Sequence, residues 1–341
     1  MQTVPSVVSV GVDIAKDKFD VAFLYGSNQS RVDTFENSDA GIKKFVRRLE
    51  KQKTAEAVPC VLESTGLYHL NMALKVHQAG YRVSVINPLI TKKYQQSSIR
   101  NAKTDTIDAL RLAEIGVKEA KLPVFSGNIQ SIEAKKLVCY MGKLEEIKRQ
   151  LRASRHFVEM TQKITGLDID LDHTEEAISE LDEQIKVLKE KICELAPKEA
   201  EELSDNVYGL GREKMAVVLA MLGDKEFKNR DQLVAFVGLD VMPRQSGTWR
   251  GKGRLSKRGN PYLRKVLYQV AWGLKQNNPV YQAEYERLRA KGTNYVTTLI
   301  ILARKFLRFL YAYYWKKTAC PGLRRRASPE LCRRACPQLT R

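Results

Sequence analysis

The sequence predicts an α/β domain followed by a mostly helical region, and three observations support this. Strand-like and helix-like patterns alternate over the first ~120 residues. From Gln130 to Pro197 the pattern is helical and rich in both charges, and from Asn206 to about Trp315 helical patterns dominate again. A chain of 341 residues is too long for one ordinary domain, which fits two or three units.

The first three predicted strands form a meander. Val7–Val12 is an apolar run typical of a buried strand, Lys18–Tyr25 alternates in polarity, and Arg31–Phe35 is a short extended run. The elements expected after them alternate between helix and strand: helix Gly41–Lys51, strand Cys60–Glu63, helix Gly66–Ala79, strand Tyr81–Ile86, helix Asp105–Ile115. This order is typical of the RNase H-like fold, since a doubly wound sheet would lack the meander.

The next region is predicted to be a helical arm. Pro123 and Gly127 mark its boundary. Apolar residues then follow a strict 3-4 spacing typical of a coiled coil: Ile178, Leu181, Ile185, Leu188, Ile192 and Leu195. The partner helix is either an earlier limb of the same chain, with a turn at Gly166–Asp172, or another protomer, and both alternatives stay open.

The third region begins with a helix-hairpin-helix-like pattern. Val207–Gly211 forms a Gly-rich turn before an apolar helix at Lys214–Leu222. Such a turn, with Gly209 and Gly211, can offer backbone amides to a phosphate, although an ordinary tight turn between helices would show the same pattern.

Composition points to a polyanionic partner. Lys and Arg total 58 against 39 acids, which gives a net charge of +19 and a pI near 9.6. The late apolar stretch Val296–Trp315 contains Arg304, Lys305 and Arg308, which favours an amphipathic helix over a membrane span. The start of the chain has no pattern of a secretory signal, and the cysteines form no C-x-x-C pair, so we expect a cytoplasmic protein without a zinc knuckle or disulfide framework.

Four acids stand at the positions where an RNase H-like fold would bring them together. Asp13 and Glu63 each end a predicted strand, and Asp105 and Asp108 lie three apart at a helix start. Grouped carboxylates repel one another, and Mg²⁺, which prefers oxygen ligands, would resolve the repulsion. Each acid taken alone is better explained as a turn, cap or solvated strand terminus, so the prediction of a metal site depends on all four together.

A strongly basic segment runs from Arg244 to Lys265. It contains eight Lys or Arg residues and no acid, interleaved with glycines that let backbone approach phosphate. Trp249 and Tyr262 could stack on bases or pack in the core. The cations expected to hold phosphates are Arg244, Arg250, Lys252, Arg254, Lys257 and Arg258.

Ser246 is the candidate nucleophile of this segment. A serine hydroxyl needs activation by a base or a metal, and no histidine is near it in the sequence. Ser256 is a rival, and either serine could instead be a turn or phosphate-contact residue.

The ordered set of motifs resembles one family. GVDIAK, LESTG, K-T-D-x-x-D-A, Y-G-L-G, Q-S-G and S-K-R-G-N-x-x-L-R follow one another as in the DEDD insertion-sequence transposases, the bridge-RNA-guided serine recombinases of bacterial mobile elements. The resemblance covers roughly Val7 to Tyr314. Two departures are Val207-Tyr208 where the family usually has Pro before the first Gly of the hairpin, and the loose spacing of Pro243 after Gly238-Leu239.

This resemblance implies a RuvC-like domain with Asp13, Glu63, Asp105 and Asp108 as Mg²⁺ ligands, and a transposase domain with Ser246 as the catalytic serine. It implies a phosphoserine link to DNA, donor and target DNA as substrates, an element-encoded guide RNA, and a homo-oligomer, dimer or tetramer, in the bacterial cytoplasm at the nucleoid. The corresponding regions are a RuvC-like domain (1–122), a coiled-coil arm (123–200), a transposase domain (201–317) and a disordered basic tail (318–341).

Three other classes compete with this interpretation. A RuvC-like junction endonuclease would hydrolyse DNA with two metals and would not need Ser246. A sugar-kinase or actin-like ATPase shares the core fold, but it requires a glycine where Ala15 stands. A non-catalytic nucleic-acid-binding protein would tolerate loss of all four acids.

Overall fold

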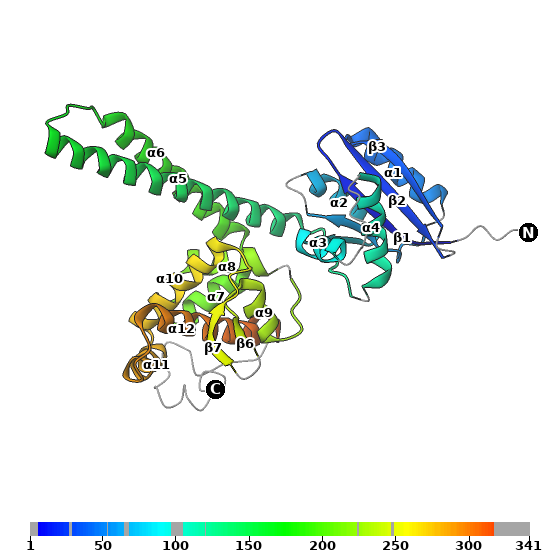
Figure 1. The fold of residues 1–341 in the computed structure, drawn as a ribbon. Coiled ribbons are helices and arrows are strands. Elements are labelled where there is room, and N and C mark those ends of the chain that lie inside the picture. Colours follow the sequence, from blue (N-terminus) through cyan, green and yellow to red (C-terminus); the bar gives the residue numbers. More distant parts are fainter. Residues whose placement is uncertain are drawn as a thin grey trace, which may run out of the picture. The chain divides into compact units, whose positions relative to one another are not determined.

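The computed structural model describes residues 6–26, 29–52, 54–64, 68–96, 105–119, 121–223, 225–246 and 249–316, without the side chains of residues 96, 105, 243–246, 249, 250 and 252. The tail predicted to be disordered, 318–341, lies outside these ranges. The chain divides into two compact units, Met1–Gly127 and Asn128–Arg341 (Figure 1).

The first unit contains a five-stranded sheet in the order β3-β2-β1-β4-β5. The strands β1 (Val7–Ile14), β2 (Lys18–Tyr25) and β3 (Ser30–Glu36) form an antiparallel meander, and β4 (Cys60–Glu63) and β5 (Val83–Ile86) join it in parallel. This confirms the predicted meander and the pairing of the first strand with the fourth.

Helices cover both faces of this sheet. Val10, Val12 and Phe23 pack with buried residues of α1 (Asp39–Lys51) and α2 (Tyr68–Gln78). On the opposite face α4 (Asp105–Lys118) packs against β1, β2 and β4. The two helical layers bury most residues of the central strands β1 and β4, which limits the freedom of the strand ends.

Helix α3 (Pro88–Gln96) was not predicted from the sequence. The sequence predicted only a strand that ends at Ile86. Pro88 occupies the first helical position, where no amide donor is needed, and the Asn87 side chain accepts a hydrogen bond from Leu89 N at 2.9 Å. The same dipeptide thus ends a strand and begins a helix.

The second unit begins with two long helices, α5 (Ile129–Thr165) and α6 (Asp172–Leu195), which pack side by side (Figure 1). Gly166, with φ 71°, ends α5 in the left-handed region. Four residues of the predicted seam are buried: Ile178, Ile185, Leu188 and Ile192. Of the two partners left open by the sequence, the one within the chain is therefore present.

The rest of the second unit is a helical domain with one β-hairpin. Its elements are α7 (Lys198–Asn206), α8 (Arg212–Leu222), α9 (Arg230–Val237), β6 (Val241–Ser246), β7 (Trp249–Leu255), α10 (Pro261–Asn277), α11 (Pro279–Ala290), α12 (Tyr295–Leu310) and a π-helical turn, η1 (Tyr311–Trp315). The α8 residues Met215–Leu222 are all buried, so this helix lies at the centre of the domain. The hairpin was not predicted.

Helix α12 contains the charged residues that favoured an amphipathic helix over a membrane-spanning one in the sequence. Lys305 is buried and pairs with Glu284 of α11 at 2.5 Å, while Arg308 pairs with Asp231 of α9 at 3.1 Å. No helix in the described ranges combines the length and apolar character needed to cross a membrane.

Candidate functional site

The strands β1 and β4 bring Asp13 and Glu63 together. Their parallel pairing aligns Val12 with Leu62, so the next residues, Asp13 and Glu63, stand side by side at the same end of the sheet. Adjacent strands lie ~4.8 Å apart and residues in register share a face. Both acids therefore face the layer formed by α4.

Gly11 brings α4 close to this end of the sheet. A Cβ atom on Gly11 would lie 2.1 Å from the Ala109 carbonyl oxygen, so the helix backbone rests directly on the strand. Asp108 immediately precedes Ala109, and its side chain is only 17% exposed. The backbone thus places Asp108 near the strand ends that carry Asp13 and Glu63. Asp105 begins the same helix, but its side chain is outside the described set.

Neighbouring side chains hold two of these acids. Thr91 of α3 donates to Glu63 Oε2 at 2.5 Å, and Gln95, one turn later, donates to Asp108 Oδ1 at 3.5 Å. Arg111 Nη1 lies 2.8 Å from Asp108 Oδ1 in an ion pair that is mostly shielded from water. Helix α3 therefore supplies part of the polar surroundings of the acids.

The donor set suits a hard cation, because Asp13, Glu63 and Asp108 offer only carboxylate oxygens. Among the side chains that the structure describes, however, no three His, Cys, Asp or Glu residues form a group that could hold a metal ion. Asp105 is not among those side chains, and Asp108 is paired with Arg111. The convergence of strand ends is present, while the meeting of all four carboxylates stays a prediction.

The sequence interpretation missed Asp20, a fifth acid at this edge. Asp20 of β2 pairs directly with Asp13 in the antiparallel register and is 4% exposed. It accepts a hydrogen bond from Thr34 Oγ1 of β3. Counting back from the turn between β1 and β2 would have placed Asp20 opposite Asp13, because direct cross-strand partners share a face.

The basic segment forms the β6–β7 hairpin and the loop after it. Ser246 ends β6 and pairs through its backbone with Trp249, so it lies at the tip of the hairpin. Arg254, Lys257 and Arg258 are exposed. The side chains of Arg244, Ser246, Arg250 and Lys252 are outside the described set, and their roles stay predictions.

The rival serine, Ser256, is already engaged. Its hydroxyl donates to Asp240 Oδ1, and its amide donates to the Asp240 carbonyl at 3.0 Å. Ser256 is half-buried just after β7, at the end of the hairpin opposite the tip. The structure thus separates the two serines, since one lies at the tip and the other at the base.

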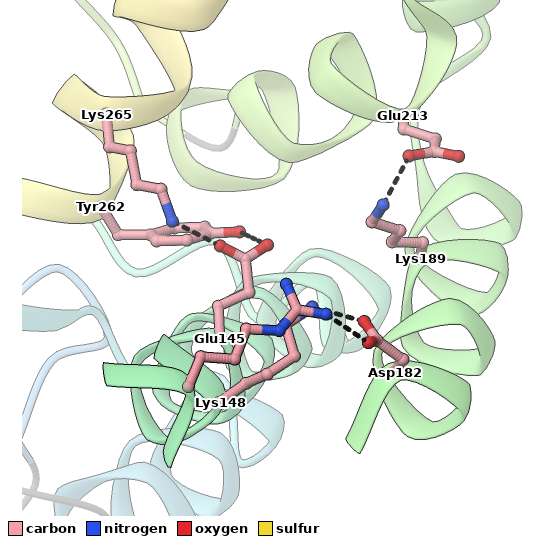
Figure 2. A network of polar contacts seen from close by, with 8 residues as sticks. Glu145, Lys148, Asp182, Lys189, Glu213, Tyr262 and Lys265 are labelled. Atoms are coloured by element: carbon pink, nitrogen blue, oxygen red, sulfur yellow. Dashed lines mark hydrogen bonds and ion pairs between the residues drawn. The ribbon is translucent and has the colours of Figure 1, made fainter. Parts of the chain in front are cut away.

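Tyr262 packs within the second unit. Its ring lies against Gly142 of α5, and its hydroxyl donates to Glu145 Oε1 at 3.1 Å (Figure 2). Lys265 also reaches Glu145, at 2.6 Å, and burial together with Glu145 raises the pKa of Tyr262. Of the two roles left open for Tyr262, packing is the one observed.

Figure 2 also shows ion pairs that join the long helices to each other and to α8. Lys148 of α5 pairs with Asp182 of α6, and Lys189 of α6 pairs with Glu213 of α8 at 3.1 Å (Figure 2). The first turn of α10, which follows the basic loop, is tied to α5 by the Lys265 ion pair and the Tyr262 hydrogen bond, and separate ion pairs join α5 to α6 and α6 to α8.

The Gly-rich turn joins α7 to α8 as the pattern predicts. A Cβ atom on Gly209 would lie 2.6 Å from the Gly273 carbonyl of α10, so Gly209 is needed for close packing. Gly211 caps α8 without a side-chain hydrogen bond, and nothing lies within 4 Å of where its Cβ would be. The open side of the turn is therefore at Gly211 and the start of α8.

Two family models match the chain. A DEDD-type IS110 model described as Transposase matches residues 10–155, and a model described as Transposase IS116/IS110/IS902 family matches residues 202–286. Together they span more than half of the chain and include all four acids and Ser246.

The chain is also similar to individual bacterial proteins. The chain is 28% identical over 309 residues to the pilin gene-inverting protein of Moraxella bovis, an alignment that covers 89% of this chain and 94% of that protein. The pilin gene-inverting protein of Moraxella lacunata is 27% identical over 309 residues, with the same coverage. A 43.6 kDa protein of insertion element IS110 from Streptomyces coelicolor is 28% identical over 161 residues, covering 45% of this chain and 39% of that protein.

Proposed function

Because the chain belongs to the IS110 family of DNA transposases, we propose that it cuts and rejoins DNA through a phosphoserine on Ser246, assisted by Mg²⁺ at its acidic edge. The observation that carries the proposal is the separation of two chemistries within one chain. Asp13 and Glu63 stand in register at the ends of neighbouring strands, and a hairpin rich in cations has Ser246 as the last residue of its first strand. Two relatives are named as pilin gene-inverting proteins, and such a name is consistent with a recombinase that rejoins the DNA it cuts.

We assign the first unit to the RNase H-like, RuvC-like fold. Support comes from the strand order β3-β2-β1-β4-β5, with an antiparallel meander and two parallel strands. The α5–α6 pair is a coiled coil in this proposal, supported by the 3-4 spacing of its buried residues. The proposed division into regions 1–122, 123–200, 201–317 and 318–341 follows from these assignments.

In the proposed reaction, Ser246 Oγ attacks a DNA phosphorus and displaces a deoxyribose oxygen, which leaves as a hydroxyl. One phosphoester bond forms as one breaks, so the bond energy is kept. A hydroxyl of the exchanged strand then attacks the phosphoserine and releases Ser246. When bound, Mg²⁺ would neutralise charge on the scissile phosphate; Asp13, Glu63, Asp105 and Asp108 would hold it.

The cations of the hairpin and loop would hold the DNA backbone. Arg254, Lys257 and Arg258 are exposed as this role requires. Arg244, Arg250 and Lys252 share the role in the proposal. The open start of α8 at Gly211 would bind a further phosphate, with Gly209 shaping the turn.

A guide RNA and a homo-oligomer complete the proposal. The guide RNA rests on the family resemblance, and the net charge of +19 suits two polyanions. The oligomer is supported by apolar residues on α5 that its packing against α6 leaves exposed: Phe157 at 72%, Met160 at 43% and Ile164 at 79%.

A covalent adduct tests this function. Purified protein is incubated with Mg²⁺, the DNA that flanks its element and RNA from the adjacent noncoding region, and is then run on a denaturing gel. We expect a protein–DNA adduct that is absent in Ser246→Ala. Cleavage without an adduct that persists in Ser246→Ala would indicate a hydrolytic, RuvC-like junction endonuclease and would refute the serine mechanism. Binding without cleavage under any condition would favour a non-catalytic protein.

A further inference from the structure

The backbone of the β6–β7 hairpin stands apart from the other elements. Its strands pair with each other, and in the described part of the chain no other element packs extensively against their backbone. Val241 and Met242 in β6 are 46% and 38% exposed. A two-stranded hairpin alone is marginally stable in water, so the direction of its tip must be set where it joins the domain.

The base of the hairpin is closed by Asp240 and Ser256. Val241 pairs with Leu255 as the last pair of the ladder, and Asp240 and Ser256 are the next residues outward on each strand. They are joined by the side-chain hydrogen bond from Ser256 Oγ to Asp240 Oδ1 and by the backbone bond between the same residues, N to O at 3.0 Å. Both residues are half-buried, which shields the bonds from water.

Just below this pair, two backbone segments cross without room for a side chain. A Cβ atom on Gly238 would lie 2.6 Å from Gly259 N, and one on Gly259 would lie 2.2 Å from Val237 O. Lys257 N donates to Gly238 O at 3.1 Å, and Arg264 Nη1 donates to Gly259 O at 2.6 Å. The loop after β7 is thereby locked to the end of α9 and to α10.

We propose that Asp240 and Ser256 are positioning residues that fix the direction of the hairpin and so present Ser246 to DNA. This inference rests on the proposed function in assigning the nucleophile to the tip. Ser256 Oγ is committed to Asp240 at the opposite end of the ladder, so it orients the hairpin instead of attacking phosphate. Loss of either side chain leaves the ladder and the backbone bond intact but removes the side-chain hydrogen bond that closes the base.

The test uses the full-length protein with Ser256→Ala, Asp240→Ala, which removes the acceptor, and Ser256→Thr, which keeps the hydroxyl. Asp231→Ala on α9 is the matched control, since its side chain is 69% exposed and lies outside the hairpin. Hydrogen exchange of the hairpin amides, residues 241–246 and 249–255 apart from Pro243, reports on the base directly. We expect exchange about tenfold faster in Ser256→Ala and Asp240→Ala, the size expected for one lost hydrogen bond, and near-normal exchange in Ser256→Thr and Asp231→Ala.

The second readout is the rate of adduct formation on Ser246, measured beside DNA affinity. The rate should fall about tenfold in Ser256→Ala and Asp240→Ala, with affinity unchanged, and Ser256→Thr should restore it. Unchanged exchange in Ser256→Ala and Asp240→Ala would overturn the inference, as would an adduct located on Ser256. If the unchanged protein forms no adduct, the proposed function fails, but the exchange data still decide whether the pair holds the hairpin. If Ser256→Ala does not fold, Asp240→Ala and the Thr variant decide it.

Discussion

The acidic edge of the first unit and the basic hairpin of the second are built in opposite ways. Asp13 and Glu63 lie at the ends of β1 and β4, and the residues that precede them, Val12 and Leu62, are completely buried. The hairpin that carries Ser246 and Arg254 has exposed strands and is held mainly at its base. A sheet buried on both faces leaves a strand end little freedom, whereas an exposed two-stranded ladder can swing.

This difference suits the different tasks that the proposed function gives to the two regions. Metal ligands have to be fixed in place, since carboxylates must converge on one ion. A nucleophile that contacts a large DNA substrate has to reach outward, and its surroundings have to be cationic. Changes at the acidic edge should therefore affect chemistry or the stability of the first unit, and changes to the exposed cations of the hairpin should affect DNA binding.

The largest expected effect is that of Asp13→Ala on DNA cleavage. Loss of a metal ligand should slow cleavage on the order of 10³-fold, because a bound ion contributes several kcal/mol to the transition state. DNA binding, measured by fluorescence anisotropy, should change little. Asp17→Asn, an exposed acid in the turn after β1, is the control. Equal losses of binding and cleavage in Asp13→Ala would contradict the division of tasks.

The second effect is on stability, through Gly11→Ala. The new methyl group would occupy the space of the α4 backbone, 2.1 Å from Ala109 O, and should destabilise the first unit by about 3 kcal/mol. All three tryptophans lie in the second unit, so urea unfolding followed by tryptophan fluorescence should keep its midpoint. Circular dichroism, which also detects the helices and strands of the first unit, should show a transition at a lower urea concentration.

The control for this experiment is Gly26→Ala. A methyl group there would only make an ordinary contact, 3.7 Å from Val8 Cγ1, and the dichroism curve should stay close to that of the unchanged protein. Early unfolding of both units in Gly11→Ala would show that the two units are coupled in stability.

The smallest effect is expected for Arg254→Gln on the hairpin. One lost phosphate contact should lower DNA affinity for all sequences alike and reduce the slope of log K against log salt by about 1. Arg149→Gln is the control, since Arg149 is exposed on α5 and already pairs with Glu146 at 2.6 Å. A salt slope that is the same in Arg254→Gln and the unchanged protein would remove Arg254 from the DNA-binding surface.

Local patterns were sufficient to predict much of the fold. Alternation in Lys18–Tyr25 and the apolar run at Cys60–Glu63 gave strands with the observed bounds. The 3-4 spacing gave α6, and Gly166 gave the end of α5. These features depend on residues a few positions apart, whose burial and backbone preferences can be read along the chain.

The hairpin could not be predicted because its strands lack apolar alternation. Its sequence, rich in Arg and Gly, is typical of a loop, and Pro243 removes one ladder donor. The base of the ladder is held by contacts outside the strands, between Asp240 and Ser256 and between Gly238 and Gly259. None of these contacts has a periodic signature.

The sequence by itself predicted most of the elements and a polyanionic partner, and it gave Asp13, Glu63, Asp105 and Asp108 as a candidate set. Only the tertiary structure decided that Thr91 donates to Glu63, that Tyr262 packs against α5, and that Ser256 is bound to Asp240. The physical reason is that strand and helix formation depends on neighbours along the chain. Hydrogen bonds and ion pairs between distant residues depend instead on how the packed elements align.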